Sequence, residues 1–307
     1  MNHSKNKRKL NGVLLLDKPA GLSSNTALQK ARRLFNAAKA GHTGVLDPLA
    51  TGLLPICFGE ATKFAQYLLD ADKAYTATLK LGEATTTGDA EGEIIASSAE
   101  AVGLADFEAA CAALTGRQRQ VPPMFSALKH EGRPLYEYAR KGITIERKPR
   151  EITIHSIEIT AFNPPQAVIN VSCSKGTYIR TLSEDIAKHC ATFAHLTALR
   201  RTRTAGFDIS QTHTLETLEA LAETERDALL LPCDVLVQHL PQIHLSNADI
   251  RLLRFGQQPA YHKQNELPEA TPVRVYSLQN EFIGLIEYRP QHACLKSIRL
   301  MDTGKEG

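Results

Sequence analysis

The sequence predicts a mixed α/β protein of the α+β kind, with a large domain followed by a small C-terminal one. A chain of 307 residues is long enough for one full core and a smaller second unit. Residues 73–82 alternate between apolar and polar side chains, as a half-buried strand does. Residues 23–35 instead gather apolar side chains on one helical face. From residue 240 the pattern changes to one helix and several short strands.

The composition is that of a soluble globular protein, with 43% hydrophobic and 22% charged residues. No apolar run is long enough to span a membrane, and the basic segment 1–11 lacks an apolar signal region, so we expect a cytoplasmic protein. The closest two of its six cysteines, Cys173 and Cys190, are 17 residues apart. This spacing favours reduced core cysteines, and the sequence predicts no metal site.

Apolar spacing predicts the elements of the large domain in order. Residues 12–16 are expected to form a buried strand that ends in the turn Asp17–Gly21. Ser23 or Ser24 is expected to cap the helix that follows. Further along we expect a short helix at 63–69, a strand at 73–82, a helix from Asp106 to Gly116, a strand at 152–159 with a bulge at 155–156, and a strand at 167–173.

Arg180 stands out because of its place in the next predicted helix. Thr177 is expected to cap that helix, which puts Arg180 at the third helical position. A cation at a helix N-terminus opposes the helix dipole. This local conflict indicates that Arg180 is there to meet an anion, although a surface pair with Glu184 would also explain it.

The C-terminal segment has its own start signal. Ser246 followed by Asp249 resembles a capping box, and Gly256 is expected to end that helix. Short strands are expected at 273–278, 282–288 and 294–300.

The stretch 41–52 is unlike any helix or strand, because three glycines, a proline and one acid fall within twelve residues. Asp47-Pro48 favours a turn, and Asp47 is the only acid between Asp17 and Glu60. Asp47 is therefore either a turn former or a carboxylate in an apolar pocket. A phosphate-binding P-loop does not fit, since no Gly-Lys-Ser/Thr follows.

The net charge of +3 is unevenly distributed. Residues 117–150 contain nine basic residues and three acids, whereas acids dominate residues 215–234. A basic face on a nearly neutral protein suits a polyanion such as RNA. Charge runs are also common on solvated surfaces, so this pattern alone leaves both interpretations open.

Several segments together resemble the TruB family of tRNA pseudouridine synthases. The loop 41–52, continued through 54–57 and 59–63, resembles motif II of that family without a gap. Asp17–Gly21 resembles motif I, and residues 173–182 resemble motif III. The match spans residues 12–238 and also includes Lys73-Ala74-Tyr75, the polar loop 85–92, the segments 120–129 and 132–142, and residues 198–207.

The resemblance implies a role for each matching residue. Asp47 would be the catalytic nucleophile, Tyr75 would pack on the target base, and Arg180 would be the active-site arginine. The other implied substrate- or RNA-binding residues are Lys18 at the floor of the site, His42 in the place of the flipped base, Lys63 in motif II, Asp89 in the polar loop, Leu199 in the pocket wall, and Arg140 and Lys141 in the thumb. For Asp89, a solvated turn is an equally open interpretation.

The resemblance also implies the domains and the substrate. We expect a basic disordered tail at 1–11 and a catalytic domain at 12–238. That domain would hold a mixed, largely antiparallel sheet with flanking helices, and a thumb insertion near 120–150. A PUA-like β-barrel domain is expected at 239–307. The substrate would be tRNA, bound at its T-arm, elbow and acceptor stem, and the target the T-loop uridine conventionally numbered 55.

The implied enzyme is an isomerase that needs no cofactor and no obligate protein partner, and we expect a monomer. Relatives of this fold also work inside guide-RNA particles, but the chain length and the C-terminal unit favour the stand-alone bacterial form. A function of another class stays open: an RNA-binding protein or tRNA-folding chaperone that does not need catalysis.

Overall fold

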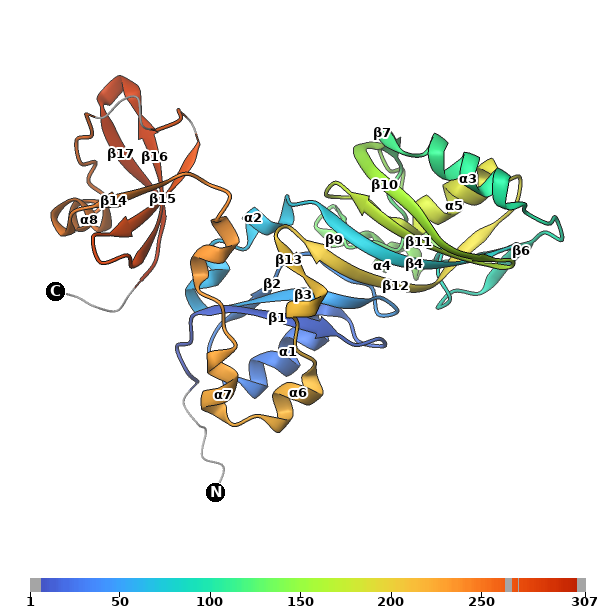
Figure 1. Ribbon diagram of the computed structural model, residues 1–307, viewed down its shortest axis with the longest axis horizontal. Coiled ribbons are helices and arrows are strands. Elements are labelled where there is room, and N and C mark those ends of the chain that lie inside the picture. Colours follow the sequence, from blue (N-terminus) through green and yellow to red (C-terminus); the bar gives the residue numbers. More distant parts are fainter. Residues whose placement is uncertain (1–6, 263–266, 270, 303–307) are drawn as a thin grey trace.

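The computed structural model describes residues 7–262, 267–269 and 271–302. They form a large unit built on a nine-stranded sheet and a smaller C-terminal unit with its own four-stranded sheet (Figure 1). The mixed α+β fold that the sequence predicts is confirmed. No helix in the described ranges is long and apolar enough to cross a membrane.

The large sheet has the order β1-β3-β12-β4-β11-β10-β7, with β2 paired to β3 and β13 paired to β12. Only the β3–β12 pairing is parallel among the described strands of this sheet, so the sheet is mixed and largely antiparallel, as expected. Its strands are β1 (Gly12–Lys18), β2 (Ala40–His42), β3 (Thr51–Phe58), β4 (Lys73–Leu81), β7 (Gly116–Gln120), β10 (Arg150–Asn163), β11 (Gln166–Cys173), β12 (Ala194–Thr204) and β13 (Phe207–Asp208).

The alternation in β4 is confirmed, since Tyr75, Ala77, Leu79 and Leu81 are all buried. The bulge predicted near residues 155–156 is also present, as a register shift between Ile154 and Ser156. These strands follow the period-2 pattern because one face of each is packed and the other is not.

β3 and β12 lie near the centre of the sheet, yet neither is among the predicted strands. β3 is buried on both faces, so it has no alternation to detect. β12 carries Arg200, Arg201 and Arg203, and basic side chains do not suggest a central strand. Arg201 is nevertheless only 1% exposed.

The parallel contact between β3 and β12 is short and depends on a glycine. It consists of Arg200 opposite Thr51 and Arg201 opposite Gly52. Gly52 also pairs with Lys18 of β1, and its φ is 101°. A Cβ at this position would lie 2.3 Å from the carbonyl oxygen of Arg201. Three backbones therefore meet here at a spacing that only glycine permits.

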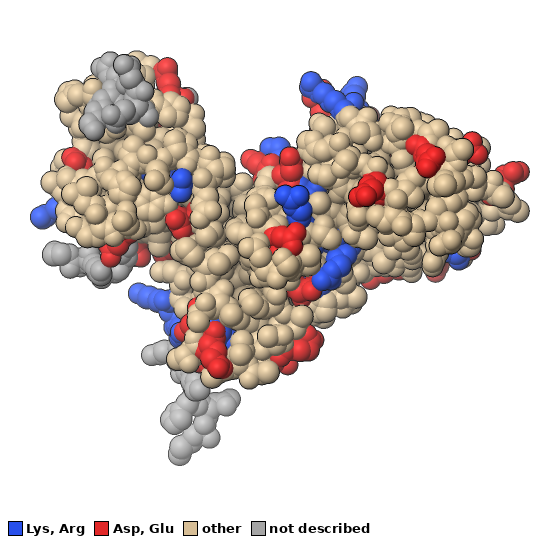
Figure 2. Space-filling view, viewed as in Figure 1, with Lys and Arg blue, Asp and Glu red and all other residues tan. Residues whose placement is uncertain are grey.

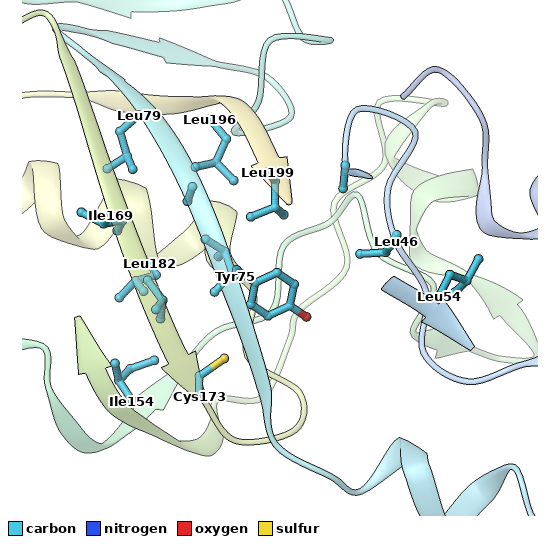
Figure 3. Close-up of a cluster of buried hydrophobic side chains, with 14 of the residues drawn as sticks. Leu46, Leu54, Tyr75, Leu79, Ile154, Ile169, Cys173, Leu182, Leu196 and Leu199 are labelled. Carbon is cyan, nitrogen blue, oxygen red and sulfur yellow. The ribbon is translucent and has the colours of Figure 1, made fainter. Parts of the chain in front are cut away.

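Helices cover the two halves of the sheet separately (Figure 1). α1 and α6 pack beside β1, β2 and β3, whereas α3 and α5 pack together over β4, β10 and β12. Buried side chains from both halves form one continuous core, part of which is shown in Figure 3. The helices of this unit are α1 (Ser24–Leu34), α2 (Gln66–Leu69), α3 (Leu104–Ala113), α4 (Leu135–Ala139), α5 (Ile179–His189), α6 (Leu215–Ala220) and α7 (Glu223–Ala228), with 3-10 turns η1 (Gly59–Lys63), η2 (Ile209–Gln211) and η3 (Cys233–Val237).

Some helix ends differ from the prediction. Ser23 caps α1 as expected, by accepting a hydrogen bond from the Thr26 amide. Gly103, not Asp106, precedes α3, so Asp106 lies inside the first turn, where its charge favours the dipole. Tyr178, not Thr177, precedes α5, because the Thr177 hydroxyl donates back to the Ser174 carbonyl.

Two further segments differ from the predicted pattern. The helix predicted at 63–69 is instead the end of η1 followed by the single turn of α2. Arg180 becomes the second residue of α5 rather than the third. Both positions still lie in the first turn, so the conflict between the Arg180 charge and the helix dipole remains.

The C-terminal unit folds around its own apolar core, which includes Ile250, Leu253, Val273 and Ile286. Ser246 caps α8 by accepting from the Asp249 amide, as predicted. Its sheet has the order β14-β15-β16-β17, and β14 is a strand that the sequence did not predict. The elements are β14 (Gln242–Leu245), α8 (Asn247–Arg254), β15 (Pro272–Ser277), β16 (Phe282–Arg289), η4 (Pro290–His292) and β17 (Cys294–Leu300).

The two units share an apolar contact. Leu285 of β16 belongs to the same buried cluster as Leu53 and Phe64 of the large unit. The rings of Phe64 and Phe282 are 5.2 Å apart. A polar contact joins the units as well, because the Tyr276 hydroxyl donates to the Asp234 carboxylate at 2.7 Å. The C-terminal unit is therefore packed against the large unit rather than tethered to it.

The predicted basic tail is only partly visible. Residues 1–6 of that segment lie outside the described residues. Arg8 is not free, because its guanidinium pairs with Asp227 and Glu223 and donates to the Phe35 carbonyl. The expectation of a disordered tail is thus wrong for Arg8, since these two acids hold it against the large unit.

Two small hairpins project from the large unit. The predicted thumb leaves the sheet after β7 and returns at β10, and it holds one hairpin and α4. Leu135 is buried within it, and the Met124 sulfur accepts from the Ile145 amide at 3.4 Å. The hairpins are β5 (Glu83–Thr85) with β6 (Ile94–Ser97), and β8 (Lys129–His130) with β9 (Arg133–Pro134).

The close approach at Gly52 predicts a measurable difference between two glycines. We expect Gly52→Ala to destabilise the fold by about 2–4 kcal/mol, from left-handed strain plus overlap with the Arg201 carbonyl. Gly116→Ala is the matched control, since Gly116 has a φ of 109° but open space around its Cβ position. It should cost about 1–2 kcal/mol. Urea unfolding measures the free energy of unfolding of each variant. If the two variants lost the same stability, the overlap with the Arg201 carbonyl would be relieved without cost.

Candidate active site

Asp47 and Arg180 form an ion pair between the glycine-rich loop and the first turn of α5. Arg180 Nη2 lies 3.0 Å from Asp47 Oδ2. The Arg180 side chain is 6% exposed, whereas that of Asp47 is 37% exposed. The carboxylate is thus held from inside the protein and open on its outer side. The anion that the sequence predicted for Arg180 is Asp47.

The backbone on both sides of Asp47 is held by Gly21 of the motif I turn and by Ser24 at the start of α1. The Ser24 hydroxyl accepts from the Leu46 amide at 2.7 Å and donates to the Leu46 carbonyl at 3.0 Å. The Pro48 carbonyl accepts from the Gly21 amide at 2.8 Å. The Asp47 carbonyl itself accepts from the Ala50 amide at 3.1 Å. Hydrogen bonds therefore hold the backbone before, at and after Asp47, and the loop is pre-organised.

Lys18 is fully buried, contrary to the surface position expected from its residue type alone. Its ammonium donates to the carbonyls of Pro19 at 2.8 Å, Leu22 at 2.6 Å and Pro48 at 3.4 Å. Burial lowers the pKa of Lys18 to about 8, and the nearby Asp47 charge opposes that shift. The structure therefore places Lys18 beneath the Asp47 loop, where it supports the floor of the site.

Arg180 also contacts two other segments of the site. It donates to the carbonyls of Thr87 at 2.8 Å and Phe125 at 2.6 Å. Its Nε lies 3.8 Å from Asp89 Oδ2. One guanidinium thus joins the Asp47 loop, the polar loop after β5 and the base of the thumb.

Asp89 belongs to the site and is not a solvated turn residue, since it is only 3% exposed. Its Oδ1 accepts from the Thr87 hydroxyl at 2.5 Å and from the Glu91 amide at 3.1 Å. With Arg180 on its other oxygen, both oxygens of this carboxylate have partners.

Asp47 experiences opposing influences on its pKa. Desolvation raises the pKa above its ordinary value, and the Asp89 charge adds to that effect. Arg180 and Lys18 lower it, but the pKa still lies above its ordinary value. Although 37% of the side chain is exposed, protein surrounds the carboxylate on its remaining sides, which is why desolvation leads.

Tyr75 and Leu199 belong to the same buried cluster as Leu46, the residue before Asp47, and form an apolar wall there. They are 9% and 8% exposed and lie on the adjacent strands β4 and β12. Figure 3 shows the Tyr75 ring at the edge of the core, with its hydroxyl directed toward the side where Leu46 lies. Burial raises the pKa of the Tyr75 phenol, whereas Arg201 lowers it through charge and a side-chain hydrogen bond.

Arg201 is the residue of this region that the sequence analysis missed. It lies directly opposite Tyr75 on β12, and its Nε donates to the Leu53 carbonyl at 2.7 Å. The signal available in the sequence was a basic residue two positions after Leu199, inside a segment that already resembled the family.

His42 lies on β2, just before the loop that carries Asp47. Burial lowers the pKa of its imidazole, with the Arg201 charge as the second cause, so the neutral form is favoured. Its Nδ1 is buried and has no hydrogen-bond partner within the described part of the chain. A neutral ring with an unused nitrogen is suited to polar contact with a ligand.

Three predicted RNA-binding residues make no contact with this centre among the described residues. Lys63 donates to Glu60 at 2.6 Å and to the Leu300 carbonyl of β17 at 2.8 Å, so it joins the two units. Arg140 and Lys141 are exposed at the end of α4, and Arg140 lies over the Tyr136 ring at 5.3 Å. Their expected contacts with RNA remain predictions.

Basic side chains elsewhere on the visible face stand in small groups (Figure 2). One group projects beside β7 and β10, where Arg117 pairs with Glu151 at 2.7 Å. A paired arginine of this kind contributes less free positive charge than the sequence count suggests.

Two solved structures share this fold over most of both chains. A chain of a Cbf5-Nop10-Gar1 complex aligns with a TM-score of 0.71 at 24% identity, covering 94% of this chain and 83% of that one. A chain of an H/ACA RNP bound to a substrate RNA containing 2′-deoxyuridine aligns with a TM-score of 0.69 at 22% identity, covering 96% and 86%. At these identities the likeness establishes the fold alone.

Sequence relatives are much closer. The tRNA pseudouridine synthase B of Neisseria gonorrhoeae is 70% identical over 303 residues, which cover 99% of this chain and 98% of that one. The proteins of the same name from Chromobacterium violaceum and Pasteurella multocida are 54% and 47% identical, and cover 92% and 96% of both chains.

Family models match the same part of the chain as the site. The model of the TruB family pseudouridylate synthase N-terminal domain matches residues 32–179, and that of the tRNA pseudouridylate synthase B C-terminal domain matches residues 180–238. The first contains Asp47 and Tyr75, and the second begins at Arg180. With these models and a relative 70% identical along nearly its whole length, the chain belongs to the TruB family of pseudouridylate synthases.

Proposed function

We propose that this protein is a tRNA pseudouridine synthase that isomerises the T-loop uridine at position 55. The observation that carries the proposal is the Asp47 carboxylate, held 3.0 Å from a buried Arg180 and open to solvent beside the apolar wall of Tyr75 and Leu199. That arrangement suits the flat face of a base held next to a nucleophile. The printed names of the close relatives support tRNA as the substrate.

The reaction breaks the N1–C1′ bond of uridine and forms a C5–C1′ bond after the base has turned. One proton leaves C5 and one is taken up at N1, so the product is an isomer and no electrons are gained or lost. Asp47 acts as the nucleophile and forms a covalent bond either to the base or to the sugar, so that the two parts stay on the enzyme while the base turns. Arg180 keeps the carboxylate ionised and aimed. Tyr75 packs on the base while it turns.

A uridine within a folded loop must leave its stack before Asp47 can reach it. His42 stands at the entrance of the loop with a buried Nδ1 that has no partner among the described residues. In this proposal His42 occupies the space that the flipped base leaves. Its neutral form suits that role, because a neutral ring stacks between bases with a smaller desolvation cost than an imidazolium.

The binding surface extends beyond the pocket. Arg140 and Lys141 of the thumb contact phosphates of the T-arm, whereas the C-terminal unit contacts the acceptor stem beyond the elbow. Recognition of this kind relies on shape and backbone charge more than on base sequence. The protein would work as a cytoplasmic monomer without a protein partner.

The alternative of an RNA-binding protein without catalysis is less well supported. Binding alone gives no reason to bury an arginine between two carboxylates, since a buried ion pair usually costs stability relative to apolar side chains. Catalysis does give a reason to bury this arginine, because the nucleophile must be ionised next to the face of a bound base.

We expect Asp47→Asn to reduce the single-turnover rate by at least about 10⁴-fold, because the amide is not a nucleophile. Binding of tRNA should be retained, since the amide fills the same space. Pseudouridine formed in unmodified tRNA transcript is the measurement. Asp106→Asn, an exposed acid on α3, is the matched control and should leave the rate unchanged. Appreciable turnover by purified Asp47→Asn would remove Asp47 as the nucleophile.

The raised pKa of Asp47 predicts the pH dependence of the rate. Only the ionised carboxylate reacts, so the rate should be full above the folded-state pKa and fall about tenfold per pH unit below it. Because burial raises that pKa, the midpoint should lie above the ordinary value of 3.8. Single-turnover rates at subsaturating protein, from about pH 3 to 8, report the pKa of the free protein and therefore measure it. A midpoint at or below 3.8 in a folded protein would contradict the assignment.

Thumb contacts with phosphate predict a change in salt dependence. Replacing Arg140 and Lys141 by glutamine should lower the slope of log K against log salt by roughly 0.7 to 0.9 for each phosphate that the thumb no longer neutralises. The matched control replaces Lys30 and Arg33, which are exposed on α1. If both double variants kept the wild-type slope, Arg140 and Lys141 would be ordinary solvated surface residues that contact no phosphate.

A further inference from the structure

Arg201 contacts both segments that carry the reactive side chains. Its Nε donates to the Leu53 carbonyl at 2.7 Å and its Nη2 to the Gly44 carbonyl at 3.5 Å. These two carbonyls flank Asp47 in the chain. On its other side, Arg201 lies directly opposite Tyr75 across β12 and β4, and its guanidinium interacts with the Tyr75 phenol. One side chain therefore spans the loop of Asp47 and the strand of Tyr75.

The charge of Arg201 is not explained by packing. The side chain is 1% exposed, and no ion pair joins it to a carboxylate in the ranges that the structure describes. Burial lowers the pKa of the guanidinium, and Tyr75 is the group that opposes this shift. An arginine still keeps its proton at neutral pH. A leucine or methionine would fill the space at a lower desolvation cost.

We propose that Arg201 is a positioning residue that sets the ring of Tyr75 relative to the Asp47 loop. Tyr75 lies on β4, whereas Asp47 precedes β3, and the two strands meet only through β12 in the described sheet. The planar fork of a guanidinium can hold two carbonyls and a phenol in fixed directions, which an ammonium cannot. This inference rests on the proposed function, because it concerns the geometry of that reaction.

The first test uses Arg201→Lys, which keeps a basic side chain and removes the fork. We expect the single-turnover rate on tRNA to fall by about 10²-fold while the Kd stays within about threefold of wild type. Arg200→Lys is the matched control. Arg200 immediately precedes Arg201 on β12, but its side chain is 43% exposed and pairs with Asp17. A folded Arg201→Lys protein with a near-normal rate would overturn the proposal.

A double-mutant cycle separates positioning from general weakening of the core. Tyr75→Phe removes the hydroxyl that Arg201 contacts and keeps the ring. In that background Arg201→Lys should cost much less than in the wild type, because the shared contact is already gone. If the rate reduction of the double variant equalled the product of the two single reductions, Arg201 would act independently of Tyr75. That result would overturn the inference.

A third measurement needs no substitution of Arg201. The side-chain ¹⁵N resonances of Arg201 should shift between the wild-type protein and Tyr75→Phe, because its hydrogen-bond acceptor disappears. Unchanged resonances would overturn the contact, whether or not the protein isomerises uridine. Turnover by the wild-type protein tests the proposed function separately, so the two failures are distinguishable.

Discussion

The parallel pairing of β3 with β12 at Gly52 and Arg201 is the contact on which the site depends. Within the described sheet, it is the pairing that joins the β1–β3 half to the half from β12 to β7. The Asp47 loop enters the first half, whereas Tyr75 lies in the second and Arg180 lies in the first turn of the helix packed over it. A backbone approach that only glycine permits thus fixes the position of the Asp47 loop relative to Tyr75 and Arg180.

Burial of charge is the second constraint, and it is concentrated in the same place. Lys18, Arg180 and Arg201 are all buried. Their partners are mainly backbone carbonyls of the loops that build the site. In a helix or a strand, backbone carbonyls accept hydrogen bonds from the backbone itself, whereas many loop carbonyls lack such a partner. A buried cation that donates to these carbonyls therefore holds the loop in place. These loops are therefore ordered by side chains that reach them from the sheet, the motif I turn and the helix.

The sequence predicted the fold class, the alternating strand β4 and the ion-pairing role of Arg180, because each has a local signal. Periodicity marks a strand with one packed face, and a cation at a helix start marks a local conflict. It did not predict β12 or the role of Arg201, since an arginine on a central strand has no local signature. Its partners, Leu53 and Tyr75, are 148 and 126 positions away in the chain. Only the fold brings these groups together.

The two acids beside Arg180, Asp89 and Asp47, differ in exposure and in how many of their oxygens have partners. Asp89 is 4% exposed in its side chain, and its oxygens are engaged by Thr87, the Glu91 amide and Arg180. Asp47 shares the same cation but keeps 37% of its side chain exposed. A carboxylate with both oxygens engaged orients its neighbours, whereas one with an open face can attack a ligand. Desolvation raises the pKa of the open carboxylate and makes it a stronger base than an ordinary aspartate, and the Arg180 charge limits that rise.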